Sequence, residues 1–302
     1  MPSLPFLLGQ LFDGLSLASI LLLAALGLSL SFGLMRVINM AHGEFLMAGG
    51  FLVYVAQQIA PGAALAFGLP LAFLGSALLG AALEVLLIRR LYGRPLDTLL
   101  ATWGVSLALQ QAARNLFDPT GVAVTAPEWL SGSFTLDAGP LSGLALAHVR
   151  LFIIGLAVVV LLAMMWLFGR TRIGLHIRAV NQNRAMAAAL GVDTRRVDLL
   201  VFALGSGIAG LAGGALALLA PVTSTVGQSY IVDAFLVVIL GGLGALRGTA
   251  LAALLLGILS ALGESVTSNS FAKVLLLLFV IAFLQFRPKG LVATRSRALE
   301  EA

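Results

Sequence analysis

Cysteine is absent from the 302 residues of this chain, which excludes disulfide bonds and thiol chemistry. Charged residues are scarce, at 10%, whereas soluble domains carry about a quarter. Lysine occurs only at Lys273 and Lys289, and no Gly-Lys-Ser/Thr sequence follows a glycine-rich loop, so the phosphate-binding motif of ATP hydrolases is missing. The three histidines form no HExxH pattern. We therefore expect no ATP hydrolysis by this chain, no metal site and no enzymatic activity.

Apolar residues, by contrast, make up 60% of the chain, and the mean hydropathy is +1.06. A membrane-spanning helix needs roughly 20 predominantly apolar residues, and such runs recur from end to end. The sequence thus predicts an all-α, multi-pass helical membrane protein with one transmembrane domain over residues 1–302. About nine spans are expected, with eight or ten as alternatives, at residues 10–34, 40–59, 65–88, 97–116, 149–168, 197–219, 231–244, 249–266 and 271–286.

The basic residues predict an orientation. A pI of 10.4 could suggest a nucleic-acid partner, but the arginines cluster between apolar runs, as in cytoplasmic loops. With nine spans and the N-terminus outside, fifteen of the 18 Lys and Arg residues fall on one side. The positive-inside rule makes that side, and the C-terminus, cytoplasmic. The segment 118–148 has neither Lys nor Arg and is predicted to be an outer loop.

A polar cluster interrupts the apolar sequence FGLMRVINMAHGEFLMAGGF, at Asn39, His42 and Glu44. Polar groups in lipid are costly and normally face a neighbour or a cavity. Two explanations stay open, namely capping of a helix break and lining of a translocation path by a discontinuous helix. The sequence ILGGLGALRGT looks like a second break in the other half of the chain. It adds four glycines to the path candidates: Gly241, Gly242, Gly244 and Gly248.

The predicted fourth span carries a polar stripe at four-residue spacing, formed by Thr98, Thr102, Ser106 and Gln110. Side chains at this spacing share one helix face. The stripe could line the route of a solute or hydrogen-bond to a neighbouring helix. Glu84 and Glu264 also lie in apolar runs, and we expect each to pair across helices.

The segment 170–196 is the one long basic loop, and it predicts two short helices. Asn181 or Asn183 can cap the second helix, and Gly191 can end it. The body of this second helix is mostly alanine, which favours close docking into a protein groove. An interfacial helix on anionic lipid is the alternative.

Several motifs together resemble one known family. They are NMAHGEFLMAGG, RAVNQNRAMAAALGV, VVILGGLGALRGT and LQFRPKGL. On these the chain is similar, along nearly its whole length, to the membrane permeases of ABC uptake systems for branched-chain amino acids and related amides.

The resemblance implies a permease domain in the bacterial inner membrane that works with four kinds of partner. These are a second permease subunit, two cytoplasmic ATPases that use ATP as their own cofactor, a periplasmic solute-binding protein, and membrane lipid. It also implies that the segment 170–196 couples to the ATPases, through Arg178, Ala179, Asn183, Ala187, Ala188 and Gly191. No cofactor of the permease itself and no nucleic-acid partner are expected.

Within the family, the sequences TLLATWGVSLALQQAAR and VGQSYIVDAFLVVILGGLG are more similar to the urea branch. Val292 after Gly290-Leu291, and the sequence LSALGESVTSNSFAKV, depart from the pattern of that branch. The resemblance therefore implies urea or a short amide as substrate, with branched-chain amino acids as the alternative. A stand-alone channel or carrier, in which Glu44 titrates, is a third hypothesis.

Overall fold

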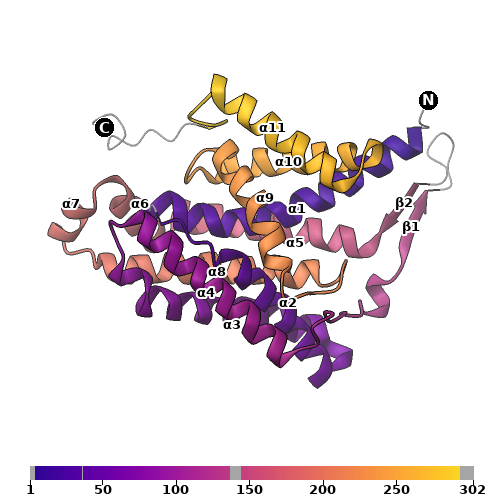
Figure 1. The fold of residues 1–302 in the computed structure, drawn as a ribbon, viewed down its shortest axis with the longest axis horizontal. Coiled ribbons are helices and arrows are strands. Elements are labelled where there is room, and N and C mark those ends of the chain that lie inside the picture. Colours follow the sequence, from indigo (N-terminus) through magenta and orange to yellow (C-terminus); the bar gives the residue numbers. More distant parts are fainter. Residues whose placement is uncertain (1–3, 36, 137–143, 293–302) are drawn as a thin grey trace.

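The computed structural model describes residues 4–35, 37–136 and 144–292, and within these ranges the chain is a helical bundle with one β-hairpin (Figure 1). The long helices are α1 (Leu4–Met35), α2 (His42–Ile59), α3 (Ala64–Leu86), α4 (Pro95–Leu116), α5 (His148–Arg170), α8 (Thr194–Leu216), α9 (Val226–Gly241), α10 (Leu246–Val266) and α11 (Asn269–Phe286). Two short helices, α6 (Arg172–Gln182) and α7 (Arg184–Ala189), lie between α5 and α8. Single turns of 3-10 helix are η1 (Pro61–Ala63), η2 (Ile88–Arg90) and η3 (Glu128–Leu130).

Each predicted span corresponds to one long helix, but several ends differ. The break in ILGGLGALRGT lies between α9 and α10, because α9 stops at Gly241 and Gly242 adopts a φ of 100°. The span predicted from residue 231 begins at Val226, since Gly227 is already buried against α2. α8 ends at Leu216 instead of residue 219.

Among the described residues, six helical segments are long and apolar enough to cross a membrane. They are Pro5–Gly33, Pro61–Arg90, His148–Arg170, Thr194–Leu216, Leu246–Val266 and Asn269–Phe286. α9 is apolar but shorter, while α2 and α4 carry the polar cluster and the polar stripe. The chain is therefore a multi-pass membrane protein, and nine crossings stay a prediction.

The ends of the bundle differ in structure. α6 and α7 lie at one end of the long axis, and the hairpin of β1 (Ser133–Leu136) and β2 (Leu144–Ala147) lies at the other (Figure 1). The hairpin falls inside the predicted outer loop, whose residues 137–143 are outside the described ranges. The two regions are thus as far apart as the prediction of opposite membrane sides requires.

The core of the bundle is built around α1 and α8, which are mostly buried, whereas α5 and α11 are mostly exposed. α8 packs against α1, α2 and α3. Its small residues allow this approach, because a Cβ added at Gly213 would lie 1.7 Å from the Leu46 carbonyl oxygen of α2. The glycine and alanine spacing of α8 therefore serves helix packing.

Replacing Gly213 by alanine is expected to destabilise the bundle, because the new methyl group collides with backbone of α2 that has no rotamer to change. Overpacking of this kind costs about 1–3 kcal/mol. Thermal unfolding of the purified protein in detergent measures it. Gly155→Ala on α5 is the matched control, since a Cβ there meets nothing within 4 Å. Equal unfolding temperatures for the two variants would contradict the packing assignment.

Candidate functional site

The turn before α2 contains Asn39, which is completely buried. Its Oδ1 accepts a hydrogen bond of 3.0 Å from the Ala41 amide, and its carbonyl accepts one of 3.3 Å from the His42 amide. Its Nδ2 is buried and has no hydrogen-bond partner among the described residues. Asn39 thus stabilises the turn that leads into α2, although the N-cap residue of α2 is Ala41, which makes no side-chain capping bond.

His42, the first residue of α2, connects this helix to α1. Its Nε2 lies 3.0 Å from the Ala24 carbonyl oxygen, and because a carbonyl only accepts, Nε2 carries the proton. The ring also stands edge-on to Phe45, with centroids 6.1 Å apart. The imidazole is thus held by backbone of α1 and by an aromatic ring of α2.

Glu44 joins α2 to the polar stripe of α4. Its Oε1 accepts hydrogen bonds from Ser106 Oγ, at 2.8 Å, and from Gln110 Nε2, at 2.9 Å. A third bond from α4 reaches the same turn, because Thr102 Oγ1 accepts from the Met40 amide at 3.1 Å. Glu44 Oε2 is buried and has no partner in the described part of the chain. One oxygen of the Glu44 carboxyl group is therefore hydrogen-bonded, and the other is not.

The four residues of the stripe share one buried face of α4, as their spacing predicts. Thr98 Oγ1 donates to the Arg94 carbonyl, at 2.9 Å, and to the Leu91 carbonyl, at 3.2 Å, and not to the segment of Asn39–Glu44. Thr102, Ser106 and Gln110 do hydrogen-bond to the segment of Met40 and Glu44, as expected if the stripe binds a neighbouring helix. A place in a translocation path stays a prediction for all four.

The second break is a close contact between the ends of α9 and α10. A Cβ at Gly248 would lie 1.9 Å from the Gly241 carbonyl oxygen, and Gly244 adopts a φ of 75°. The segment after α11 pairs with this break, because the Leu291 amide donates to the Leu240 carbonyl at 2.8 Å. The amide of Val292 donates likewise to Gly241, at 3.2 Å. Nothing in the residue pattern pointed to this pairing.

We call α6 and α7 the knob, and α7 begins and ends as its residues predict. Asn183, of the two candidate asparagines, caps α7 by accepting from the Met186 amide at 2.9 Å. Gly191 follows α7 with a φ of 86°. Ala187 is buried against the bundle, and Ala188 faces solvent.

Two apolar side chains of the knob, Leu175 and Met186, are more than half exposed, and so is Leu190 directly after α7. Arg178 is also exposed, and its Nη1 donates to the Phe168 carbonyl of α5. Ala179 is half-buried beside it. The knob thus exposes these apolar side chains among polar ones, and it buries Gly174, Ile177, Val180 and Ala187.

A cavity of about 380 Å³ lies where the knob meets the second break. Arg178, Gly244, Arg247 and Val292 are among the residues that line it. It therefore brings together one predicted coupling residue and one predicted path residue. The Asn39–Glu44 cluster does not line it.

Glu84 and Glu264 find partners near them in the chain, so the expectation that each pairs across helices is wrong. Glu84 is completely buried at the end of α3, and Arg89 approaches it to 2.8 Å. Glu264 accepts from Ser260 Oγ, one turn earlier on α10, at 3.1 Å. Arg89 follows Glu84 by five residues, a spacing that could have indicated the pair.

A helical bundle with apolar spans, a polar helix break sealed by a neighbouring helix and a two-helix knob at one end is the architecture of a multi-pass membrane transport protein. The chain matches the family described as "Branched-chain amino acid transport system / permease component" over residues 10–284, and it belongs to that family. It is therefore an ABC transporter permease of the inner membrane.

Two of the relatives align with nearly the whole length of this chain. The BraD permease protein of the high-affinity branched-chain amino acid transport system of Pseudomonas aeruginosa is 28% identical over 97% of each chain. LivH of Escherichia coli K12, with the same description, is 27% identical over 95% of this chain and 96% of its own. The ribose import permease protein RbsC of the same strain is 33% identical over 109 residues, 34% of each chain. No solved structure matches the chain significantly.

The hydrogen bonds at Glu44 predict a measurable coupling between α2 and α4. Glu44→Ala and Gln110→Ala should each lower stability, and the double variant should lose less than their sum by about 1 kcal/mol. Titrating the purified protein with a denaturing detergent measures all three. Pairing Glu44→Ala with Gln111→Ala, whose residue is exposed on α4, is the control and should be additive. Additivity in both cycles would argue against the bonds.

Proposed function

We propose that this chain is the membrane-spanning permease subunit of a bacterial ABC importer that takes up branched-chain amino acids. The observation that carries the proposal is the extent of the match, because full-length relatives described as branched-chain amino acid permeases align over 95–97% of this chain. A solute-binding protein on the outer side would deliver the substrate. Two ATPase subunits on the cytoplasmic side would supply the energy.

The relatives favour branched-chain amino acids over the urea expected from the sequence motifs. The full-length relatives BraD and LivH carry branched-chain amino acids in their descriptions. RbsC, a ribose permease, reaches a higher identity but over only a third of each chain. Identity over a short segment therefore does not predict the solute, and agreement over the whole length is the better guide.

We infer that the path runs beside the start of α2, between this chain and a second permease subunit. Two buried polar atoms there, Asn39 Nδ2 and Glu44 Oε2, have no partner among the described residues. Unsatisfied polar atoms in a buried site are costly unless another conformation or a ligand satisfies them. The break at Gly241–Gly248 would act as the flexible counterpart on the cytoplasmic side.

The knob supports docking to a partner protein. Its outward side chains Leu175, Met186 and Leu190 form an apolar surface on an otherwise basic segment. Ala187 holds α7 against the bundle, so a force on the knob reaches the spans. An ATPase groove is the occupant that the family assignment favours, and the interfacial lipid site is the alternative.

Uptake in a strain that lacks the gene tests the substrate. Labelled leucine uptake should be lost and labelled urea uptake retained, because the proposed importer serves branched-chain amino acids. The wild-type gene on a plasmid should restore leucine uptake. Loss of urea uptake with normal leucine uptake would overturn the proposal in favour of the urea branch. Transport by the purified chain alone in liposomes, without ATPases, would instead favour a stand-alone carrier.

Ala188→Glu tests the knob as the ATPase-docking surface. Ala188 is exposed, so a glutamate should leave folding intact while placing a charge in the interface. Co-purification of the ATPase subunits should fall about tenfold or more, as for an interface residue worth over 1 kcal/mol. The control is Ala123→Glu, an exposed alanine at the hairpin end of the bundle. Unchanged co-purification with Ala188→Glu would reject docking at this face.

A further inference from the structure

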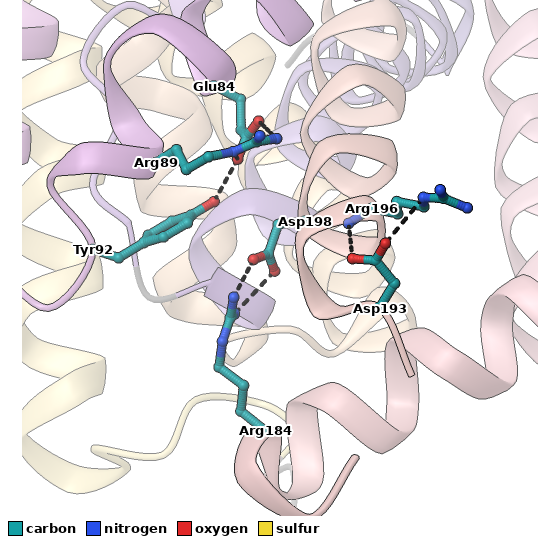
Figure 2. A network of polar contacts seen from close by, with 7 residues as sticks. All are labelled: Glu84, Arg89, Tyr92, Arg184, Asp193, Arg196 and Asp198. Carbon is teal, nitrogen blue, oxygen red and sulfur yellow. Dashed lines mark hydrogen bonds and ion pairs between the residues drawn. The ribbon is translucent and has the colours of Figure 1, made fainter. Parts of the chain in front are cut away.

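The knob is tied to α8 by an ion pair with two contacts. Arg184 is the first residue of α7, and Asp198 lies in the second turn of α8. Arg184 Nη1 lies 3.1 Å from Asp198 Oδ1, and Nη2 donates to Oδ2 (Figure 2). The Asp198 side chain is only 3% exposed, whereas that of Arg184 is 46% exposed. A carboxylate buried in a transmembrane helix is thus neutralised by a side chain of the knob.

The same guanidinium reaches a second element. Its carbon lies 5.5 Å from the ring centroid of Tyr92, in the turn between η2 and α4, within the range of a cation–π contact. The Tyr92 hydroxyl donates to Glu84 Oε1 at 3.1 Å, and burial raises the pKa of this phenol, so it stays a donor. Arg89 completes the network with hydrogen bonds of 2.8 and 3.2 Å to Glu84 (Figure 2).

The network contains two buried acids and two arginines, so it is balanced in charge. Its members come from α3, η2, the turn after η2, α7 and α8. Asp193 and Arg196, also in Figure 2, form an exposed pair at the start of α8 and contribute nothing to the network. Without Arg184, the network would hold two acids and only one arginine.

From Asp198 the packing continues to the candidate path. Phe202 lies one turn further along α8 and stands edge-on to Phe45 of α2, with centroids 6.2 Å apart. Phe45 stands edge-on to His42, at 6.1 Å. Both phenylalanines are fully buried, so a displacement of α8 would press on closely packed side chains. The start of α2, with its unsatisfied polar atoms, lies at the end of this series.

We propose that Arg184 is a positioning residue that transmits movement of the knob to α8 and α3, through its ion pair with Asp198 and its contact with Tyr92. This proposal rests on the proposed function, in which ATPases move the knob. Arg184 acts through Asp198 and Tyr92 and need not touch the substrate. A network that only stabilised the fold would affect folded yield and leave the ratio of transport to ATP hydrolysis unchanged.

The test uses the complete transporter in liposomes, with this chain carrying Arg184→Gln. ATPase co-purification and ATP hydrolysis should persist, while leucine transported per ATP hydrolysed should fall about tenfold, a typical coupling effect. Arg94→Gln is the matched control, since Arg94 lies near the network in an exposed pair with Asp97. This control should keep the wild-type ratio. Wild-type ratios in both variants would overturn the proposal.

A second variant protects the test against misfolding. Tyr92→Phe keeps the ring under Arg184 and removes only the hydroxyl that reaches Glu84, so it should fold and lower the ratio by less than Arg184→Gln. The reciprocal pair Arg184→Asp with Asp198→Arg should recover part of the lost coupling. If neither Tyr92→Phe nor the reciprocal pair changes the ratio in these directions, the proposal fails. Absence of ATP-dependent leucine transport by the wild-type complex would instead reject the proposed function.

Discussion

The rest of the structure depends on the backbone contact between α2 and α8. Gly213 of α8 lies directly against the Leu46 carbonyl, and Gly49 of α2 lies against Gly210 in the same way. No side chain separates the two helices at these points. Because lipid offers no hydrophobic driving force between helices, such close packing and polar contacts supply most of the association. At these points α2 and α8 are packed so closely that one helix cannot approach the other further without a backbone collision.

This close packing explains why the polar cluster of α2 is almost fully engaged by protein atoms. With α8 on one side and α1 on another, Asn39, His42 and Glu44 are buried, and each must find a hydrogen-bond partner close by. α4 supplies most of them for Glu44, since its stripe forms a polar face opposite the carboxylate. The remaining unpartnered atoms, Asn39 Nδ2 and Glu44 Oε2, mark the place where a change of conformation costs fewest bonds.

Much of this was predictable from sequence, and the misses have physical causes. Apolar runs predicted each long helix, because period and length are local properties, and Asn183 and Gly191 marked the ends of α7 through capping and positive φ. The stripe of α4 was correctly placed on one face, but its partner Glu44 is over sixty residues away, and spacing carries no information on such pairs. Spacing likewise did not predict the ion pair of Arg184 with Asp198 or the pairing of Leu291 with Leu240. Partners of Glu84 were sought across helices, although Arg89 was nearby in the chain.

α8 contacts both the knob and α2, so it connects the two regions proposed to act in transport. Its first turns hold Asp198 against the knob, and its middle holds Gly210 and Gly213 against α2. A helix is stiff along its axis, and at Gly210 and Gly213 no side chain lies between α2 and α8 to absorb a displacement. A movement that enters at Arg184 must therefore either carry α2 with it or break the contact. In the first case α2 would move relative to α4, and the hydrogen bonds from α4 to Glu44 could be exchanged for bonds to water or solute.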